Sequence, residues 1–162
     1  MVRHFSHPHP LCPFEVEEEQ GLTCSGCELN LSGSAYKCNT RSSTCDFYLH
    51  KSCFELQRKI QHASHPQHPL ILLSSPPSRW GFFFCNACDG SGSSFTYHCK
   101  ACDFDLHVHC SSLPDNVTRH DHQHPLGLVF SFPKVEDEEE DKYCGVCKTG
   151  FKEEFWAYRC KE

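Results

Sequence analysis

Several features that define common protein classes are missing from this chain of 162 residues. The N-terminal segment MVRHFSHPHPLCPF has neither the apolar core nor the small-residue cleavage site of a secretory signal peptide. No run approaches the roughly 18 consecutive apolar residues that a membrane-spanning helix needs. We therefore expect an intracellular protein, cytoplasmic or nuclear, without a transmembrane segment.

Positive charge is also scarce. Lysine and arginine number 15 against 21 aspartates and glutamates, which gives a formal net charge of −6, and acidic runs lie at 15–19 and 136–141. Proteins that bind nucleic acid use clustered Lys and Arg side chains to neutralise phosphates, and no basic stripe follows this chain. We expect no nucleic-acid partner and interpret the acidic runs as solvated loops.

Cysteine and histidine, in contrast, are abundant, with 14 and 13 residues. In a reducing compartment this composition indicates metal binding, and a disulfide scaffold is the alternative. Two cassettes, CDFYLHKSC and CDFDLHVHC, repeat one pattern, and a CxxC pair and a lone cysteine precede each of them. The first set is Cys24, Cys27, Cys38, Cys45, His50 and Cys53, and the second is Cys85, Cys88, Cys99, Cys102, His107 and Cys110.

The repeat divides the chain into units that each open on a His-Pro-Leu segment. We expect the first unit over residues 7–62 and the second over residues 68–120. A third begins at residue 124 and runs to residue 162. It contains His124, Cys144, Cys147 and Cys160 but no HxxC pair, which predicts a truncated copy.

Metal would dominate the stability of such units. A unit of about 50 residues buries little apolar surface, whereas a structural zinc adds roughly 10–16 kcal/mol of apparent binding free energy. Eight Cys and His ligands in each complete unit would form two tetrahedral sites, built from either consecutive or alternate ligand pairs. The sequence therefore predicts about two Zn²⁺ per complete unit.

The order of these ligands resembles that of the C1 domain and, more closely, that of the divergent C1 domain of plant cysteine/histidine-rich proteins. The resemblance rests on the HPL, CxxC, YxC and CDFxLHxxC signatures, including Tyr36-Lys37-Cys38 and Tyr97-His98-Cys99. It implies a small zinc-stabilised α+β fold. We expect tandem cross-brace (C1-like) zinc-finger modules with short antiparallel strands and at most a short helix each.

The resemblance also implies how the ligands pair. One site of each unit would join the CxxC and HxxC residues: Cys24, Cys27, His50 and Cys53, and then Cys85, Cys88, His107 and Cys110. The other would join a histidine at each end of the unit with the middle cysteines: His9, Cys38, Cys45 and His62, and then His68, Cys99, Cys102 and His120. The histidines stay open, because His7 could replace His9, His65 could replace His62 or His68, and His122 or His124 could compete with His120.

Apolar residues between the ligands predict the small cores. Phe47, Leu49, Phe104 and Leu106 alternate as a strand requires, and Phe84 beside Cys85 is also expected to be buried. Trp80 and Phe82 lie on a variable loop and could form an exposed contact patch. We further expect a β-hairpin whose tip is the Gly/Ser segment between the CxxC pair and the next cysteine, and a helical turn or two after Cys53 and Cys110.

The resemblance implies a non-catalytic zinc module without catalytic residues that mediates protein interactions in plant intracellular signalling or stress response. Three alternatives remain. Diacylglycerol binding, as in typical C1 domains, is disfavoured because the hairpin tips lack the proline and Gln-Gly of those domains. A histone-tail reader finger would need Cys85 and Cys88 to complete the first unit, but these two cysteines already open the second unit. A thiol–disulfide oxidoreductase would place its CxxC at a helix N-terminus in a larger α/β fold.

Overall fold

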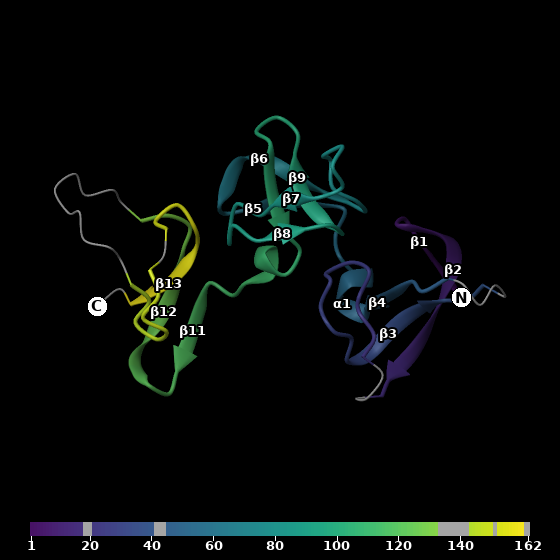
Figure 1. The fold of residues 1–162 in the computed structure, drawn as a ribbon, viewed down its shortest axis with the longest axis horizontal. Coiled ribbons are helices and arrows are strands. Elements are labelled where there is room, and N and C mark those ends of the chain that lie inside the picture. Colours follow the sequence, from purple (N-terminus) through teal and green to yellow (C-terminus); the bar gives the residue numbers. More distant parts are fainter. Residues whose placement is uncertain (18–20, 41–44, 133–142, 151, 161–162) are drawn as a thin grey trace.

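The computed structural model describes residues 1–17, 21–40, 45–132, 143–150 and 152–160. Three antiparallel sheets lie in a row along the molecule, and a small two-stranded sheet accompanies the second of them (Figure 1). Within the described residues, helix is limited to the short turns α1 and η1, so the fold is small and mostly β. This agrees with the short antiparallel strands and at most one short helix per unit that we expected in an α+β module. Among the described residues, no helix is long and apolar enough to span a membrane.

The first sheet has the strand order β1–β2–β3–β4. Its strands are β1 (Val2–His4), β2 (His7–Val16), β3 (Gly33–Cys38) and β4 (Tyr48–His50). The long strand β2 pairs with β3 along the whole length of β3, from Leu11 opposite Cys38 to Val16 opposite Gly33. Directly after β4, the short helix α1 (Lys51–Phe54) ends the first unit.

The second sheet repeats this plan with the order β10–β9–β6–β5. Its strands are β5 (Lys59–His62), β6 (His65–Leu73), β9 (Thr96–Cys99) and β10 (Phe104–His107), followed by the 3-10 turn η1 (Cys110–Ser112). A separate pair, β7 (Phe83–Phe84) and β8 (Ser91–Gly92), encloses the CxxC turn. The third sheet contains β11 (Asn116–Arg119), β12 (His122–Val129) and β13 (Ala157–Cys160).

Each unit opens on a hairpin whose two strands are joined by a two-residue turn: β1–β2, β5–β6 and β11–β12. His62 belongs to one of these hairpins, because β5 pairs with β6 in the second sheet. His120 lies in the turn of the third hairpin. Both histidines that we expected to close a unit therefore open the next one.

Local expectations are met in part. The predicted strand at Ile71–Leu73 forms the end of β6. The predicted Gly/Ser-tipped hairpin is wrong for the second unit, because β8 pairs with β7 across the CxxC turn while β9 pairs with β6 and β10. Asp89 explains the tight turn, since it adopts a positive φ of 61° and its N–H donates to the Cys85 carbonyl at 2.9 Å.

The apolar cores lie where each sheet meets its ligand turns. Leu49 and Leu106 are fully buried, as predicted for the CDFxL cassettes. The prediction for Phe84 is wrong: Phe84 is 61% exposed and Phe83 is buried instead. Successive side chains of a strand point to opposite faces, so only one of these two neighbours in β7 can face the core.

Truncation of a core leucine should destabilise the first unit. We expect Leu49→Ala to lower the free energy of unfolding by about 2 to 5 kcal/mol, because Leu49 is 0% exposed and its loss leaves a cavity. Denaturant unfolding of the zinc-loaded protein measures the change. Leu29→Ala is the matched control, since Leu29 is 50% exposed and should change stability by less than about 0.5 kcal/mol. Equal effects of the two variants would contradict the assigned core.

Candidate metal centres

The Cys and His side chains gather into clusters whose ligand atoms lie within 4.8 Å of one another. Four clusters hold four residues each: His7, His9, Cys38 and Cys45; Cys24, Cys27, His50 and Cys53; His65, His68, Cys99 and Cys102; Cys85, Cys88, His107 and Cys110. A further group in the third unit holds His122, His124 and Cys160. In both complete units the ligand pairs alternate between two clusters, which is the cross-brace that we expected.

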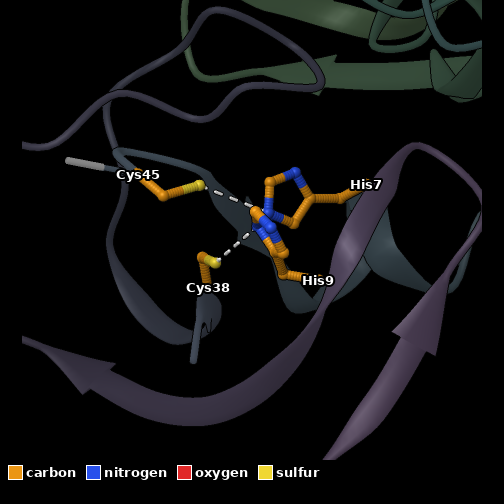
Figure 2. A group of neighbouring side chains, drawn as sticks. All are labelled: His7, His9, Cys38 and Cys45. Atoms are coloured by element: carbon orange, nitrogen blue, oxygen red, sulfur yellow. Dashed lines mark hydrogen bonds between the residues drawn. The ribbon is translucent and has the colours of Figure 1, made fainter. Parts of the chain in front are cut away.

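The first cluster joins the opening strand of unit one to its middle cysteines. His7 and His9 are two positions apart in β2 and therefore point to the same face. Figure 2 shows their rings converging with the sulfurs of Cys38 and Cys45. The Nε2 of His7 is 3.3 Å from the Cys45 sulfur, and the Nδ1 of His9 is 3.7 Å from the Cys38 sulfur.

The second cluster joins the CxxC turn to the end of the sheet. The Nδ1 of His50 lies 3.3 Å from the Cys27 sulfur and 3.9 Å from the Cys53 sulfur. On the other side of the ring, Nε2–H donates to the Asn30 carbonyl at 3.0 Å. A carbonyl acceptor at Nε2 holds the proton there and leaves the Nδ1 lone pair free for a metal.

Unit two repeats this arrangement. The Nδ1 of His107 lies 3.4 Å from the Cys88 sulfur and 3.8 Å from the Cys110 sulfur, and its Nε2–H donates to the Ser91 carbonyl at 3.3 Å. In the other cluster, the Nδ1 of His68 is 3.2 Å from the Cys102 sulfur. The same ring positions therefore face the sulfurs in both units.

One nitrogen atom of these clusters favours a bound metal ion. The Nε2 of His65 is buried and has no hydrogen-bond partner among the described residues. A buried nitrogen without a partner is costly, and a metal ion shared with His68, Cys99 and Cys102 would satisfy it.

The separations between ligand atoms also suit zinc. Zinc bonds of about 2.3 Å to sulfur and about 2.0 Å to nitrogen at a tetrahedral angle place the two atoms ~3.5 Å apart. The observed sulfur–nitrogen distances, from 3.2 Å for His68 to 3.9 Å for Cys53, lie on both sides of this value. The donor sets, two or three thiols with one or two imidazoles, are those of structural zinc sites.

The thiols of the CxxC/HxxC clusters differ in acidity. Hydrogen bonds from Cys27 and Cys53 to the sulfur of Cys24 hold its pKa well below the usual range. The corresponding bond from Cys110 lowers the pKa of Cys85 to about 3. The pKa values of Cys53 and Cys110 are raised, because each keeps its proton and donates it in a hydrogen bond to the sulfur of Cys24 or Cys85, which favours the protonated thiol. One sulfur in each of these clusters is therefore held as thiolate, the form that binds metal.

Aromatic packing orients the opening histidines. Phe47 stacks on His7 with the ring centroids 4.2 Å apart, and Phe104 stacks on His65 at 4.7 Å. We expected both phenylalanines in the cores, and both do pack against the buried residues, but the stacking on histidine was not predicted. No local signal in the CDF motif identifies the ring that lies opposite, because the contact joins residues 40 positions apart (Phe47 and His7) in different segments.

In the two complete units the structure brings the predicted ligands together, with two exceptions. His62 and His120 were expected to complete the middle-cysteine sites, but His7 and His65 take those places. The Nδ1 of His62 lies 2.8 Å from the Ser64 hydroxyl, and its ring stacks on Trp156. We considered His7 and His65 only as replacements for other histidines, although the His-x-His spacing of His7 and His9 already places both on one face of a strand.

The third unit contains part of the same site. Cys160 lies with His124 and His122, whereas Cys144 and Cys147, which we also expected as ligands, are not in this group. The Cys144–Cys147 pair forms the same turn as the earlier CxxC pairs, with the Lys148 N–H donating to the Cys144 carbonyl at 2.9 Å. A hydrogen bond from the Thr149 hydroxyl lowers the pKa of Cys147 to about 7.

A curated protein is similar to part of this chain. Probable nucleoredoxin 1 of Arabidopsis thaliana is 33% identical over 70 residues, which make up 43% of this chain but only 11% of that protein. No solved structure matches the chain.

A family model described as C1 domain matches residues 5–54 and 63–111, which together are more than half of the chain. Each matched segment contains the Cys and His clusters of one complete unit, so both complete units are covered. The chain therefore belongs to the C1 domain family.

Proposed function

We propose that this chain is a non-catalytic, zinc-stabilised protein-interaction module. The observation that carries the proposal is that Cys and His side chains fill all four positions of each cluster in the complete units. A catalytic zinc keeps a coordination position open for water or substrate, whereas a closed site is structural. The metal would then hold the fold, and function would reside on the surface.

The surface that fits a partner best lies on unit two. Trp80, Phe82 and Phe84 are 70%, 42% and 61% exposed. Phe82 also lines cavities of about 400 Å³ and about 530 Å³ with Phe84. Large exposed aromatic side chains are typical anchors of protein interfaces. We assign protein binding to this aromatic patch, defined as Trp80, Phe82 and Phe84.

A thiol–disulfide oxidoreductase is the second candidate, because one relative is described as a probable nucleoredoxin and Cys85 has a strongly lowered pKa. The CxxC pairs oppose it. Cys85 and Cys88 lie in a tight turn within a cluster rather than at a helix N-terminus, and His107 and Cys110 occupy the same site. A thiolate bound to zinc is not free to attack a disulfide.

The finer assignment rests on the signatures in the sequence. HPL, YxC and CDFxLHxxC support membership of the divergent C1 group of plants, and the similarity to an Arabidopsis protein agrees with it. We propose a role in intracellular signalling or stress response, in the cytoplasm or nucleus, with a protein as partner. Diacylglycerol binding is disfavoured because segments 28–37 and 89–98 lack the proline and Gln-Gly of typical C1 domains.

Zinc content tests the ligand assignment. We expect one zinc for each four-residue cluster, hence four in the two complete units, measured by elemental mass spectrometry under reducing conditions. His65→Asn should lose one of them, because it removes a ligand. His62→Asn is the matched control from the same hairpin and should lose none. Loss of zinc in the His62 variant instead would favour the prediction that His62 binds metal with His9, Cys38 and Cys45, and would contradict the assignment of His65 as a ligand.

Substitution of the aromatic patch tests the binding surface. The triple variant Trp80→Ser, Phe82→Ser and Phe84→Ser should keep its zinc but lose most of the proteins that cross-link to the wild-type chain in plant extract. Vesicles of phosphatidylcholine and phosphatidylserine with diacylglycerol should not retain the wild-type protein. Unchanged cross-linking by the variant would exclude the patch, and diacylglycerol-dependent sedimentation would replace protein binding with lipid binding.

A reductase assay separates the two candidates. We expect the zinc-loaded protein to reduce a disulfide substrate no faster than the same protein alkylated at its thiols, because the CxxC sulfurs are committed to the metal. Removal of zinc with a chelator should expose reactive thiols and unfold the units. Sustained turnover by fully zinc-loaded protein would instead favour the oxidoreductase.

A further inference from the structure

The complete units are joined by more than a linker. Phe95 of unit two is only 3% exposed, and its ring packs against unit one. It stacks on His4 with centroids 6.0 Å apart and planes 14° apart, and Phe5 lies 5.7 Å away. The Phe95 N–H donates to the Gly26 carbonyl at 3.1 Å. An aromatic residue of one unit is therefore buried by the unit before it.

The same contact recurs between units two and three. Trp156 stacks on His62 with centroids 5.2 Å apart and planes 15° apart. The backbone N–H of Trp156 donates to the Ala87 carbonyl at 2.9 Å. Phe95 lies four residues before Cys99, the last residue of β9, and Trp156 lies four residues before Cys160, the last residue of β13, so they occupy one position of the repeat.

The receiving residues are also equivalent. Gly26 and Ala87 are both the third residue of a CxxC pair, and both are buried. Close approach explains the small residue, because a Cβ at Gly26 would lie 3.0 Å from the Phe95 ring and from Leu49. His4 and His62 pair with His7 and His65 at the same point of the opening hairpin.

An acidic residue after each of the first two CxxC pairs completes the contact. Glu28 accepts hydrogen bonds from the Ser93 N–H at 3.2 Å and from the Ser93 hydroxyl. Asp89 pairs with Lys152 at 2.8 Å. Both contacts again join a unit to the following one.

Short, hydrogen-bonded linkers limit the freedom of the units. Between α1 and β5 the chain has only residues 55–58, and the Tyr97 hydroxyl donates to the Gln57 carbonyl at 2.8 Å. Between η1 and β11 it has residues 113–115, and the Tyr158 hydroxyl donates to the Pro114 carbonyl at 2.7 Å. The two tyrosines also occupy one position of the repeat.

We propose that this repeated contact is a docking interface that makes the units one rigid, directional array. The plug is the aromatic residue, Phe95 or Trp156. The socket of the preceding unit combines the hairpin histidine, the small third residue of the CxxC pair and the acid that follows it. The partner that fits a socket is thus the next C1-type unit, recognised by a ring and an adjacent backbone N–H.

The array has a direction, because the first unit lacks the aromatic residue of the contact and the third unit lacks the residues that receive it. Unit one has Ser34 in place of the plug, and the Ser34 hydroxyl instead donates to Glu15 at 2.6 Å. Unit three has Arg119, Val146 and Lys148 at the three socket positions. Neither the branched Val146 nor Lys148 reproduces the socket, so the same contact does not join copies head to tail.

Phe95→Ser tests the interface in the zinc-loaded chain, since serine is the residue of unit one at this position. In wild type, residual dipolar couplings should give units one and two a single alignment tensor. In the variant the tensors should separate, and the amide of residue 95 should exchange with solvent on the order of tenfold faster. Zinc content should stay unchanged. Trp80→Ser, an exposed aromatic of the same unit, is the control and should leave all three readouts as in wild type.

Glu28→Lys provides a second variant, because it removes the acceptor of both Ser93 hydrogen bonds without changing a core residue. It introduces the residue that unit three has at this position, and we expect faster exchange at Ser93 with full zinc content. Independent alignment of the two units in wild type would overturn the proposal. The proposal would also be overturned if Glu28→Lys exchanged at Ser93 no faster than Trp80→Ser. If Phe95→Ser loses zinc, the result for Glu28→Lys alone decides.

Discussion

In each complete unit, four Cys and His side chains converge at two places, and these clusters hold the strands and turns in position. Each unit has a core of a few buried leucines and aromatic residues, too small to hold its loops by packing alone. Because the ligand pairs alternate, the first strand is joined to the middle of the unit and the CxxC turn to its end. A cluster that loses its geometry therefore releases distant parts of the same sheet at once.

The CxxC turn links this constraint to the arrangement of the units. Its sulfurs belong to a cluster, while the carbonyl of Gly26 or Ala87 accepts a hydrogen bond from the following unit. The positive φ of Glu28 and Asp89 directs their carboxylates to residues of that following unit. The same turn thus serves metal binding with its side chains and docking with its backbone, so loss of metal would disturb both.

In the two complete units the CxxC sulfurs belong to clusters of four Cys and His side chains, and we therefore place binding on the surface. The exposed aromatic patch of unit two lies beside the docking interface, and Glu28 of unit one lines a cavity together with Phe82 and Phe84. A binding face that draws residues from two units requires those units to be held in place. The Cys/His clusters, the docking contact and the aromatic patch together therefore favour the interaction module that we propose.

The repeat, the Cys/His cassettes and the burial of Leu49 and Leu106 could be predicted from the sequence, because these features depend on spacing within one short segment. Tertiary structure decided which histidines complete the clusters: β5 pairs with β6, so His65 faces the middle cysteines and His62 faces Trp156. It also decided that Phe83 rather than Phe84 is buried, since adjacent strand residues face opposite sides and the sequence does not specify which side is covered. Contacts between distant segments depend on strand pairing, which local spacing does not encode.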